Sequence, residues 1–151
     1  TLSSSSAASD VYKRQNLHVP YRILNIIGPK MIANHYGRIV NIASIWSVVT
    51  KRGRSIYTTS KNALVGLTKT LAVEWASHNI LVNAVSPGFT LTELTKTTNT
   101  AKQLKTIENM IPAKRMAEPV EIARVVTFLC SELNTYLTGQ NIIIDGGYTI
   151  V

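Results

Sequence analysis

Cysteine and long apolar runs are nearly absent from this sequence of 151 residues, which is a length that suits one domain. The single cysteine, Cys130, cannot form a disulfide within the chain, so nothing indicates an oxidising compartment. Because it lies within an apolar helical pattern, we expect a buried core thiol. No apolar run approaches the roughly 18 residues that span a membrane, and the N-terminus lacks the basic-then-apolar order of a signal peptide. We therefore predict a soluble, cytoplasmic protein without a membrane partner.

Metal-ligand spacing is also missing, because His18, His35 and His78 show none with one another or with Cys130. The formal charge of +8 and the pI near 9.8 would suit nucleic-acid binding. The charges are scattered, however, and only residues 51–54 are densely basic. No aromatic residues interleave with basic ones as they do in a base-stacking platform. We expect neither a metal site nor a nucleic-acid partner.

Residues 1–15 form a serine-rich segment without helical or strand periodicity. Its last part, residues 10–15, looks like translated adapter sequence fused to a truncated reading frame. A natural flexible tail is the alternative, and both interpretations predict disorder. We therefore treat residues 1–15 as a disordered or non-native tail and residues 16–151 as the folded part.

Helical and strand patterns alternate through residues 16–151. Apolar residues at helical spacing predict three helices: 17–36, 57–77 and 119–132. Short apolar, β-branched runs predict three buried strands: 38–44, 80–86 and 139–147. We expect Pro29 to bend the first helix and Gly37 to end it, and the polar stretch 89–110 to be helical or a mobile flap. This order predicts a parallel sheet with right-handed crossovers and helices on both faces.

The stretch 44–61 contains the clearest sign of chemistry. Tyr57 and Lys61 lie four positions apart, so they share one face of a helix. A lysine cation beside a phenol favours the phenolate, which would let Tyr57 act as acid or base near neutral pH. The pair alone is weak evidence among six tyrosines, but Ser44 ends a predicted strand thirteen positions before Tyr57. A strand-end hydroxyl and an acidic phenol together suit protonation of a carbonyl oxygen.

This order of residues resembles the short-chain dehydrogenase/reductase family. The resemblance implies that Ser44, Tyr57 and Lys61 are catalytic and that Asn16 holds a proton-relay water, although a helix cap is the alternative for Asn16. It also implies an α/β fold, the C-terminal half of a doubly wound parallel-sheet Rossmann fold with three αβα layers.

The resemblance also implies NAD or NADP as cofactor, and the sequence does not distinguish them. The expected contacts with the cofactor are Tyr57, Lys61, Pro87, Gly88, Thr90 and Thr92. For the segment 87–92, an ordinary strand-ending turn is the alternative to cofactor contact. Residues 145–147 resemble the family's closing motif, and we expect a structural turn there. The family's glycine-rich phosphate loop is absent, so we expect this chain alone to be inactive.

These observations predict an oxidoreductase that interconverts a secondary alcohol and a ketone, with a 3-oxoacyl thioester or a polyol as admissible substrates. The resemblance implies a homo-dimer or homo-tetramer built on the helices at 17–36 and 57–77. A catalytically silent Rossmann-like subunit or binding module is the alternative. The cations at 51–54 lie near the mouth of the expected site, where they are compatible with an anionic substrate group or with a merely solvated loop.

Overall fold

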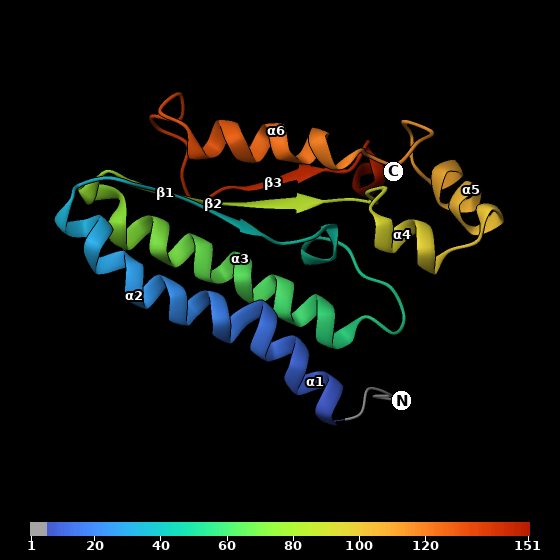
Figure 1. Ribbon diagram of the computed structural model, residues 1–151, viewed down its shortest axis with the longest axis horizontal. Helices are drawn as coiled ribbons and strands as arrows, with labels where there is room; N and C mark the ends of the chain where they lie inside the picture. Colours follow the sequence, from blue (N-terminus) through green and yellow to red (C-terminus); the bar gives the residue numbers. More distant parts are fainter. Residues whose placement is uncertain (1–5) are drawn as a thin grey trace.

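Three parallel strands form the middle layer of the structure, a computed structural model that describes residues 6–151. They are β1 (Gly37–Ile42), β2 (Ile80–Pro87) and β3 (Asn141–Ile144), and their order in the sheet follows the chain. Gly37 pairs with Ile80, and Ala84 pairs with Asn141. The carboxyl ends of all three strands therefore meet at one edge of the sheet, which Figure 1 shows at the arrowheads.

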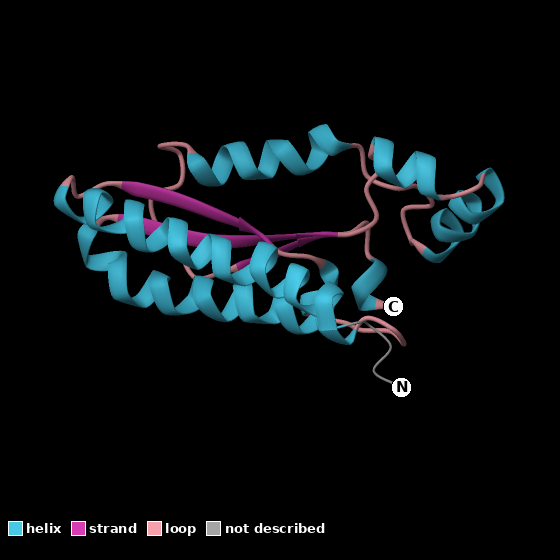
Figure 2. Ribbon diagram, turned by 60° about the horizontal axis from the view of Figure 1, so that its bottom comes forward, coloured by secondary structure: helices cyan, strands magenta, loops and turns pink. Residues whose placement is uncertain are grey.

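Helices cover both faces of this sheet, as Figures 1 and 2 show. The α-helices are α1 (Ser6–Lys13), α2 (Val19–Ala33), α3 (Ser55–Trp75), α4 (Glu93–Thr98), α5 (Ala101–Met110) and α6 (Pro119–Cys130). The short helical segments are the π-helical η1 (Arg14–His18) and the 3-10 turns η2 (Ile45–Ser47), η3 (Ala76–His78) and η4 (Tyr148–Ile150). The predicted three-layer α/β arrangement is confirmed. None of the helices in residues 6–151 is both long and apolar enough to cross a membrane.

The two faces of β2 pack against different helices, because successive side chains of a strand point to opposite sides. Ile80 and Val82 pack with Leu71 of α3, whereas Val85 packs with Leu129 of α6. The central strand is thus buried on both sides, as its continuous apolar run predicts.

The connections from β1 to β2 and from β2 to β3 differ in hand. Both move one strand further in the same direction across the sheet. The first passes through α3 on one face and the second through α6 on the other (Figure 1). Our prediction that every crossover is right-handed is therefore wrong for one of the two. An amphipathic pattern shows that a helix covers a sheet but not which face it covers.

The N-terminal segment is more regular than the sequence predicts. Residues 1–5 lie outside the described part of the chain, but α1 runs through η1 into α2. The prediction of disorder is wrong for residues 6–15, because this helix gains a tertiary contact: the Tyr12 ring lies edge-on to Tyr57, with 5.8 Å between ring centres. That residues 1–15 are non-native stays a prediction.

The end of α2 differs from the prediction at Gly37. The left-handed residue after the helix is His35, with a φ of 49°. Gly37 instead begins β1, where a Cβ would lie 2.8 Å from Sδ of Met31 and 3.0 Å from Cγ2 of Ile80. The glycine is needed for close packing rather than for the turn.

Cys130 is exposed, so our prediction of a core thiol is wrong. It is the last residue of α6, and the inward position belongs to its neighbour Leu129, which is 1% exposed. The helical pattern did not determine which of two adjacent apolar residues faces the sheet.

The packing of α2 on α3 generates a stability prediction at Gly28. A Cβ there would lie 2.6 Å from Cη2 of Trp75, so Gly28→Ala should lower the free energy of unfolding by about 1–3 kcal/mol through overpacking. Gly66→Ala in α3 is the matched control. Nothing lies within 4 Å of its added Cβ, and better helix propensity should raise stability by up to about 1 kcal/mol. Equal urea midpoints for the two variants would contradict the packing argument.

Candidate functional site

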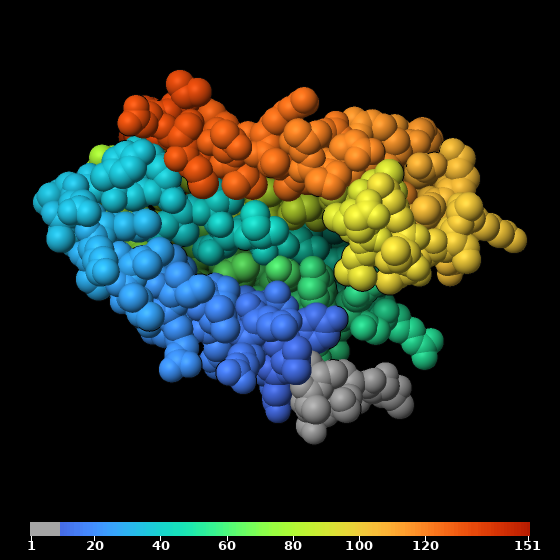
Figure 3. All heavy atoms as spheres, viewed as in Figure 1, coloured from blue at the N-terminus to red at the C-terminus, as the bar shows by residue number. Residues whose placement is uncertain are grey.

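The predicted site residues gather at the carboxyl edge of the sheet, where open α/β folds bind ligands. Ser44 follows β1, Pro87 ends β2 and Asp145 follows β3. In Figure 3 the teal atoms around the end of β1 lie recessed between the yellow atoms of α4 and the blue and green helices. The sheet topology alone thus brings together residues that are far apart in the sequence.

Ser44 is buried, and it caps the 3-10 turn η2. Its Oγ accepts a hydrogen bond from the backbone N–H of Trp46 at 3.3 Å. Because that bond uses a lone pair of the oxygen, the hydroxyl proton remains available for donation. Ser44 therefore has a hydroxyl proton free to donate to a ligand oxygen.

Tyr57 and Lys61 lie in the first two turns of α3 and are close in space. Lys61 is 8% exposed, and its Nζ donates to the carbonyl oxygen of Ile42 at 2.8 Å and lies 5.7 Å from the centre of the Tyr57 ring. Burial lowers the pKa of Lys61, because desolvation disfavours the charged form. An ammonium has three donors, so the Ile42 bond leaves further N–H groups for a ligand.

Asn16 lies within η1, a π-helical segment that packs against α3. It is not at a helix start, since α1 precedes η1, so the capping alternative is wrong. Isolated π-helical turns occur frequently at functional sites. Within residues 6–151, no direct hydrogen bond joins the side chains of Asn16, Ser44, Tyr57 and Lys61, so a ligand or water would have to bridge them.

A ring of three hydrogen bonds holds the loop after Ser44, and the sequence did not reveal it. Ser86 Oγ donates to Oδ1 of Asn141 at 2.6 Å, Asn141 Nδ2 donates to Oγ of Ser47 at 3.1 Å, and the two serine oxygens lie 3.1 Å apart. These residues come from η2, β2 and β3. Ser86 has no exposed surface, so the ring fixes η2, and with it Ser44, against the sheet.

The segment 87–92 makes mostly local contacts. A Cβ on Gly88 would lie 2.8 Å from Cα of Asp145, so glycine lets the ends of β2 and β3 approach. Thr90 Oγ1 donates to the carbonyl of Gly88 at 3.3 Å. Thr92 caps α4 by accepting from the N–H of Thr95 at 3.1 Å. Each residue therefore has a structural role, and contact with a cofactor stays a prediction.

The turn at 145–147 is held by the Asp145 carboxylate. Burial by itself would raise the pKa of Asp145, but hydrogen bonds from Thr149 and from the backbone N–H of Gly147 outweigh it, so the pKa lies below the usual value. The structural turn expected there is what the geometry provides. No group of three or more metal-ligating side chains gathers in the part of the chain that the structure describes.

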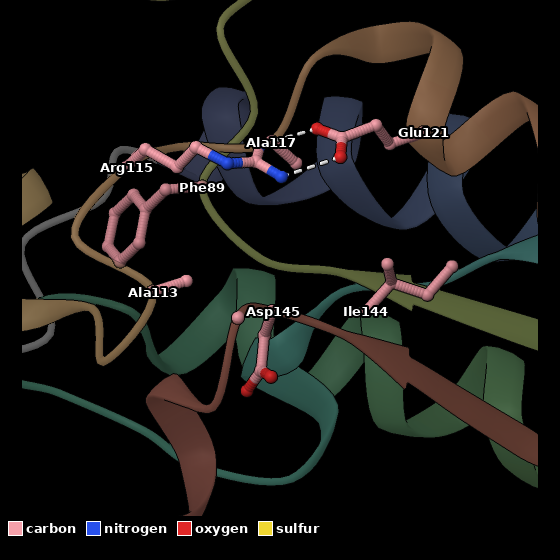
Figure 4. A pocket seen from close by; sticks show the side chains of 8 residues that line it. Phe89, Ala113, Arg115, Ala117, Glu121, Ile144 and Asp145 are labelled. Carbon is pink, nitrogen blue, oxygen red and sulfur yellow. Dashed lines mark hydrogen bonds and ion pairs between the residues drawn. The ribbon is translucent and has the colours of Figure 1, made fainter.

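Figure 4 shows a cavity of about 220 Å³ beside this turn. Arg115 and Glu121 point toward each other across its rim in a bidentate pair of 2.6 and 2.7 Å, while Asp145 points away from them (Figure 4). The hydrogen bonds from Arg115 and from the N–H of Glu118 lower the pKa of Glu121 to about 2. The pair anchors the start of α6, and its two opposite charges neutralise each other.

This ion pair predicts a pH dependence of stability. The pKa of Glu121 is depressed in the folded state from 4.5 to about 2, so the stabilisation is complete above the ordinary pKa and is lost as the pH falls toward about 2. The difference in unfolding free energy between wild type and Glu121→Gln should be constant from about pH 5 upward and shrink below it. Urea titrations across this range measure the difference. Glu132→Gln removes a carboxylate that forms no ion pair within residues 6–151, and a matching acid response in that control would contradict the assignment.

Comparison with known protein families gives one match that covers nearly the whole chain. The profile of the family described as Enoyl-(Acyl carrier protein) reductase, a short-chain alcohol dehydrogenase profile, matches residues 3–149. The match includes Ser44, Tyr57 and Lys61, and it extends into the segment that we predicted to be a tail.

Individual proteins agree with the family match. An NAD-dependent glycerol dehydrogenase of Listeria innocua is 44% identical over 135 residues, which make up 89% of this chain and 53% of that protein. A 3-oxoacyl-(acyl-carrier-protein) reductase of Aquifex aeolicus is 47% identical over 118 residues, or 78% of this chain and 47% of that protein. The chain spans about half the length of these curated relatives. A gluconate 5-dehydrogenase from Burkholderia cenocepacia, crystallised with NADP and tartrate, superposes with a TM-score of 0.93 at 27% identity, over 99% of this chain and 59% of that one.

Proposed function

Because the chain belongs to the short-chain dehydrogenase/reductase family, we propose that it contains the proton-transfer site of an NAD(P)-dependent oxidoreductase. The reaction would interconvert a secondary alcohol and a ketone. The observation that carries the proposal is the buried Lys61 ammonium, held 5.7 Å from the Tyr57 ring. A cation beside the phenol oxygen stabilises the negative charge that develops there when the proton is transferred.

Each residue has a distinct role in the proposed reaction. The Ser44 hydroxyl donates a hydrogen bond to the substrate oxygen, because the bond from the N–H of Trp46 uses a lone pair and leaves the hydroxyl proton available. The Tyr57 phenol gives a proton to that oxygen in reduction and takes it back in oxidation. Both interactions strengthen as negative charge grows on the oxygen, which is the requirement for stabilising a transition state. Asn16 would hold the water through which the proton reaches solvent.

The donor set fits a nicotinamide cofactor, which when bound supplies or accepts the hydride. Lys61 has N–H groups beyond the one bonded to Ile42, and these can hold the hydroxyls of a ribose. Tyr57, Pro87, Gly88, Thr90 and Thr92 are the further proposed contacts. These residues do not decide between NAD and NADP.

We also propose that the substrate is a small molecule with an anionic group, that the protein acts in the cytoplasm, and that residues 16–151 form the catalytic part of the longer protein. The exposed thiol of Cys130 supports a reducing environment. Two copies would associate through α2 and α3, where Ile26 is 68% and Val73 82% exposed. Large apolar side chains on neighbouring helices are typical of interaction surfaces.

Removal of the Tyr57 hydroxyl tests the proposed chemistry. In the full-length protein, Tyr57→Phe should lower kcat by about 10²–10⁴-fold, because the transferable proton is gone while the ring remains. Reduced-nicotinamide absorbance measures the rate, and Tyr136→Phe, at a residue 95% exposed, is the control. Lys61→Ala should also lower kcat, because the cation that stabilises the developing charge is removed. Near wild-type turnover of Tyr57→Phe would refute the assignment, whereas an inactive wild type would favour the silent-subunit alternative.

The proposed association predicts a concentration-independent dimer or tetramer by light scattering at micromolar concentration. Val73→Glu should shift the mass toward the monomer, since it places a charge on the apolar surface. Glu74→Gln, at the next position and also exposed, should leave the mass unchanged. A wild type that is monomeric under these conditions would contradict the proposal.

A further inference from the structure

Two cations lie against the same tryptophan at the rim of the site. Lys51 Nζ lies 5.3 Å and Arg54 Cζ 5.8 Å from the centre of the Trp46 ring. Arg54 Cζ also lies 6.0 Å from the centre of the Tyr57 ring. These distances are within the range of cation–π attraction. The guanidinium of Arg54 is thus held between an aromatic ring beside Ser44 and the proposed proton donor.

Within residues 6–151, no ion pair joins these cations to a carboxylate. The ion pairs among the described residues involve Lys13, Lys96, Lys105 and Arg115, and none involves the loop 51–54. The sequence explains this, because residues 11–73 contain ten Lys and Arg but no Asp or Glu. Such a region attracts anions, and an unpaired arginine fixed by stacking is available to bind one.

Trp46, which the two cations contact, also lines a cavity of about 270 Å³. Its apolar lining includes Met110, Tyr148 and Val151, and hydroxyls come from Thr50 and Thr149. Trp46 itself is only 7% exposed. The surroundings of Trp46 therefore offer apolar surface for a carbon skeleton and two cations on the same tryptophan.

We propose that Arg54, assisted by Lys51, binds a carboxylate or phosphate group of the substrate, while Trp46 packs against its carbon skeleton. This inference rests on the proposed function, because it places the anion next to the carbon whose oxygen meets Ser44 and Tyr57. Arginine suits the role, since its planar fork matches two oxygens of either group. The substrates are then hydroxy and oxo acids or phosphorylated polyols.

Arg52 provides a control that distinguishes a specific anion-binding site from general electrostatic attraction. It has the same charge and lies in the same loop, but its guanidinium contacts neither ring among the described aromatic contacts. General electrostatic steering would make the three cations equivalent, whereas a specific subsite makes Arg54 dominant.

The test is an NMR titration of the ¹⁵N-labelled full-length protein with malonate and, separately, with inorganic phosphate. The indole resonances of Trp46 and Trp75 are assigned with the variants Trp46→Phe and Trp75→Phe, and on titration Trp46 should shift and Trp75 should not. Arg54→Gln should raise the Kd by about 10- to 100-fold through loss of a bidentate charge-assisted contact, Lys51→Gln should raise it less, and Arg52→Gln should change it by less than about twofold. The tighter of the two probes identifies the carboxylate or the phosphate as the natural group.

Three outcomes would overturn the inference: no shift of Trp46, equal weakening by Arg52→Gln and Arg54→Gln, or an equal shift of Trp75. Tyr57→Phe keeps the ring that Arg54 contacts, so it should bind the anion normally even though turnover is lost. Anion binding without any alcohol or ketone turnover in the wild type would refute the proposed function but not the subsite. Turnover without anion binding would refute only the subsite.

Discussion

The geometry of the site depends on one buried ammonium group. A charge removed from water is costly unless it is paired or hydrogen-bonded, and Lys61 meets this need through the carbonyl of Ile42 at 2.8 Å. Ile42 is the last residue of β1, so the bond forms only when the first turns of α3 lie over the end of that strand. The same arrangement brings Tyr57, one turn earlier, to the loop that contains Ser44. The lowered pKa of Lys61 shows that the charge is held there against a desolvation penalty.

Side-chain hydrogen bonds then fix the strand ends to one another. The ring of Ser47, Ser86 and Asn141 joins η2 to β2 and β3, and the absence of a side chain at Gly88 lets β2 approach Asp145. The opposite edge of the sheet has its own anchor, because the buried Asn83 donates to the carbonyl of Leu137 at 2.7 Å and accepts from the N–H of Gln140. The middle of β2 at Asn83 and its end at Ser86 are therefore both held by polar groups with satisfied partners, which rigidifies the scaffold under the site.

Spacing between nearby residues predicted much of the candidate site. Contacts between residues far apart in the sequence were not predictable. Ser44 at a strand end and Tyr57 with Lys61 on one helical face follow from the periods of strand and helix, so their neighbourhood was predictable. Ser47 and Asn141 are 94 positions apart, and no periodicity connects them. The position of Arg54 on Trp46 depends on how a loop folds back, which the sequence does not encode as a pattern.

The fold was predictable from the sequence to a similar extent as the site. Strand and helix positions followed from apolar spacing, and the three layers followed from their alternation. The hand of the crossovers, the exposure of Cys130 and the helical course of residues 6–15 depend on which neighbour each element meets. Gly37 and Gly88 show the same limit, because a glycine that suggests a turn can instead lie where side chains, at Gly37, or a second backbone, at Gly88, leave little room for a Cβ.

The location of Tyr57 in the first turn of α3 has a consequence for the electrostatics of the site. The N-terminus of a helix has a partial positive charge from its unpaired N–H groups, and here it adds to Lys61 and Arg54 around the same ring. These sources are fixed before any substrate arrives, so little solvent or protein rearrangement is needed when an oxygen becomes negative. The electrostatic field at the Tyr57 ring therefore has three sources. The backbone of the helix N-terminus is one that no side-chain substitution removes, and Lys61 and Arg54 are the other two. Evolution of this site could therefore exchange the loop cation to suit new ligands while the helix and the buried lysine continue to support the proposed proton transfer.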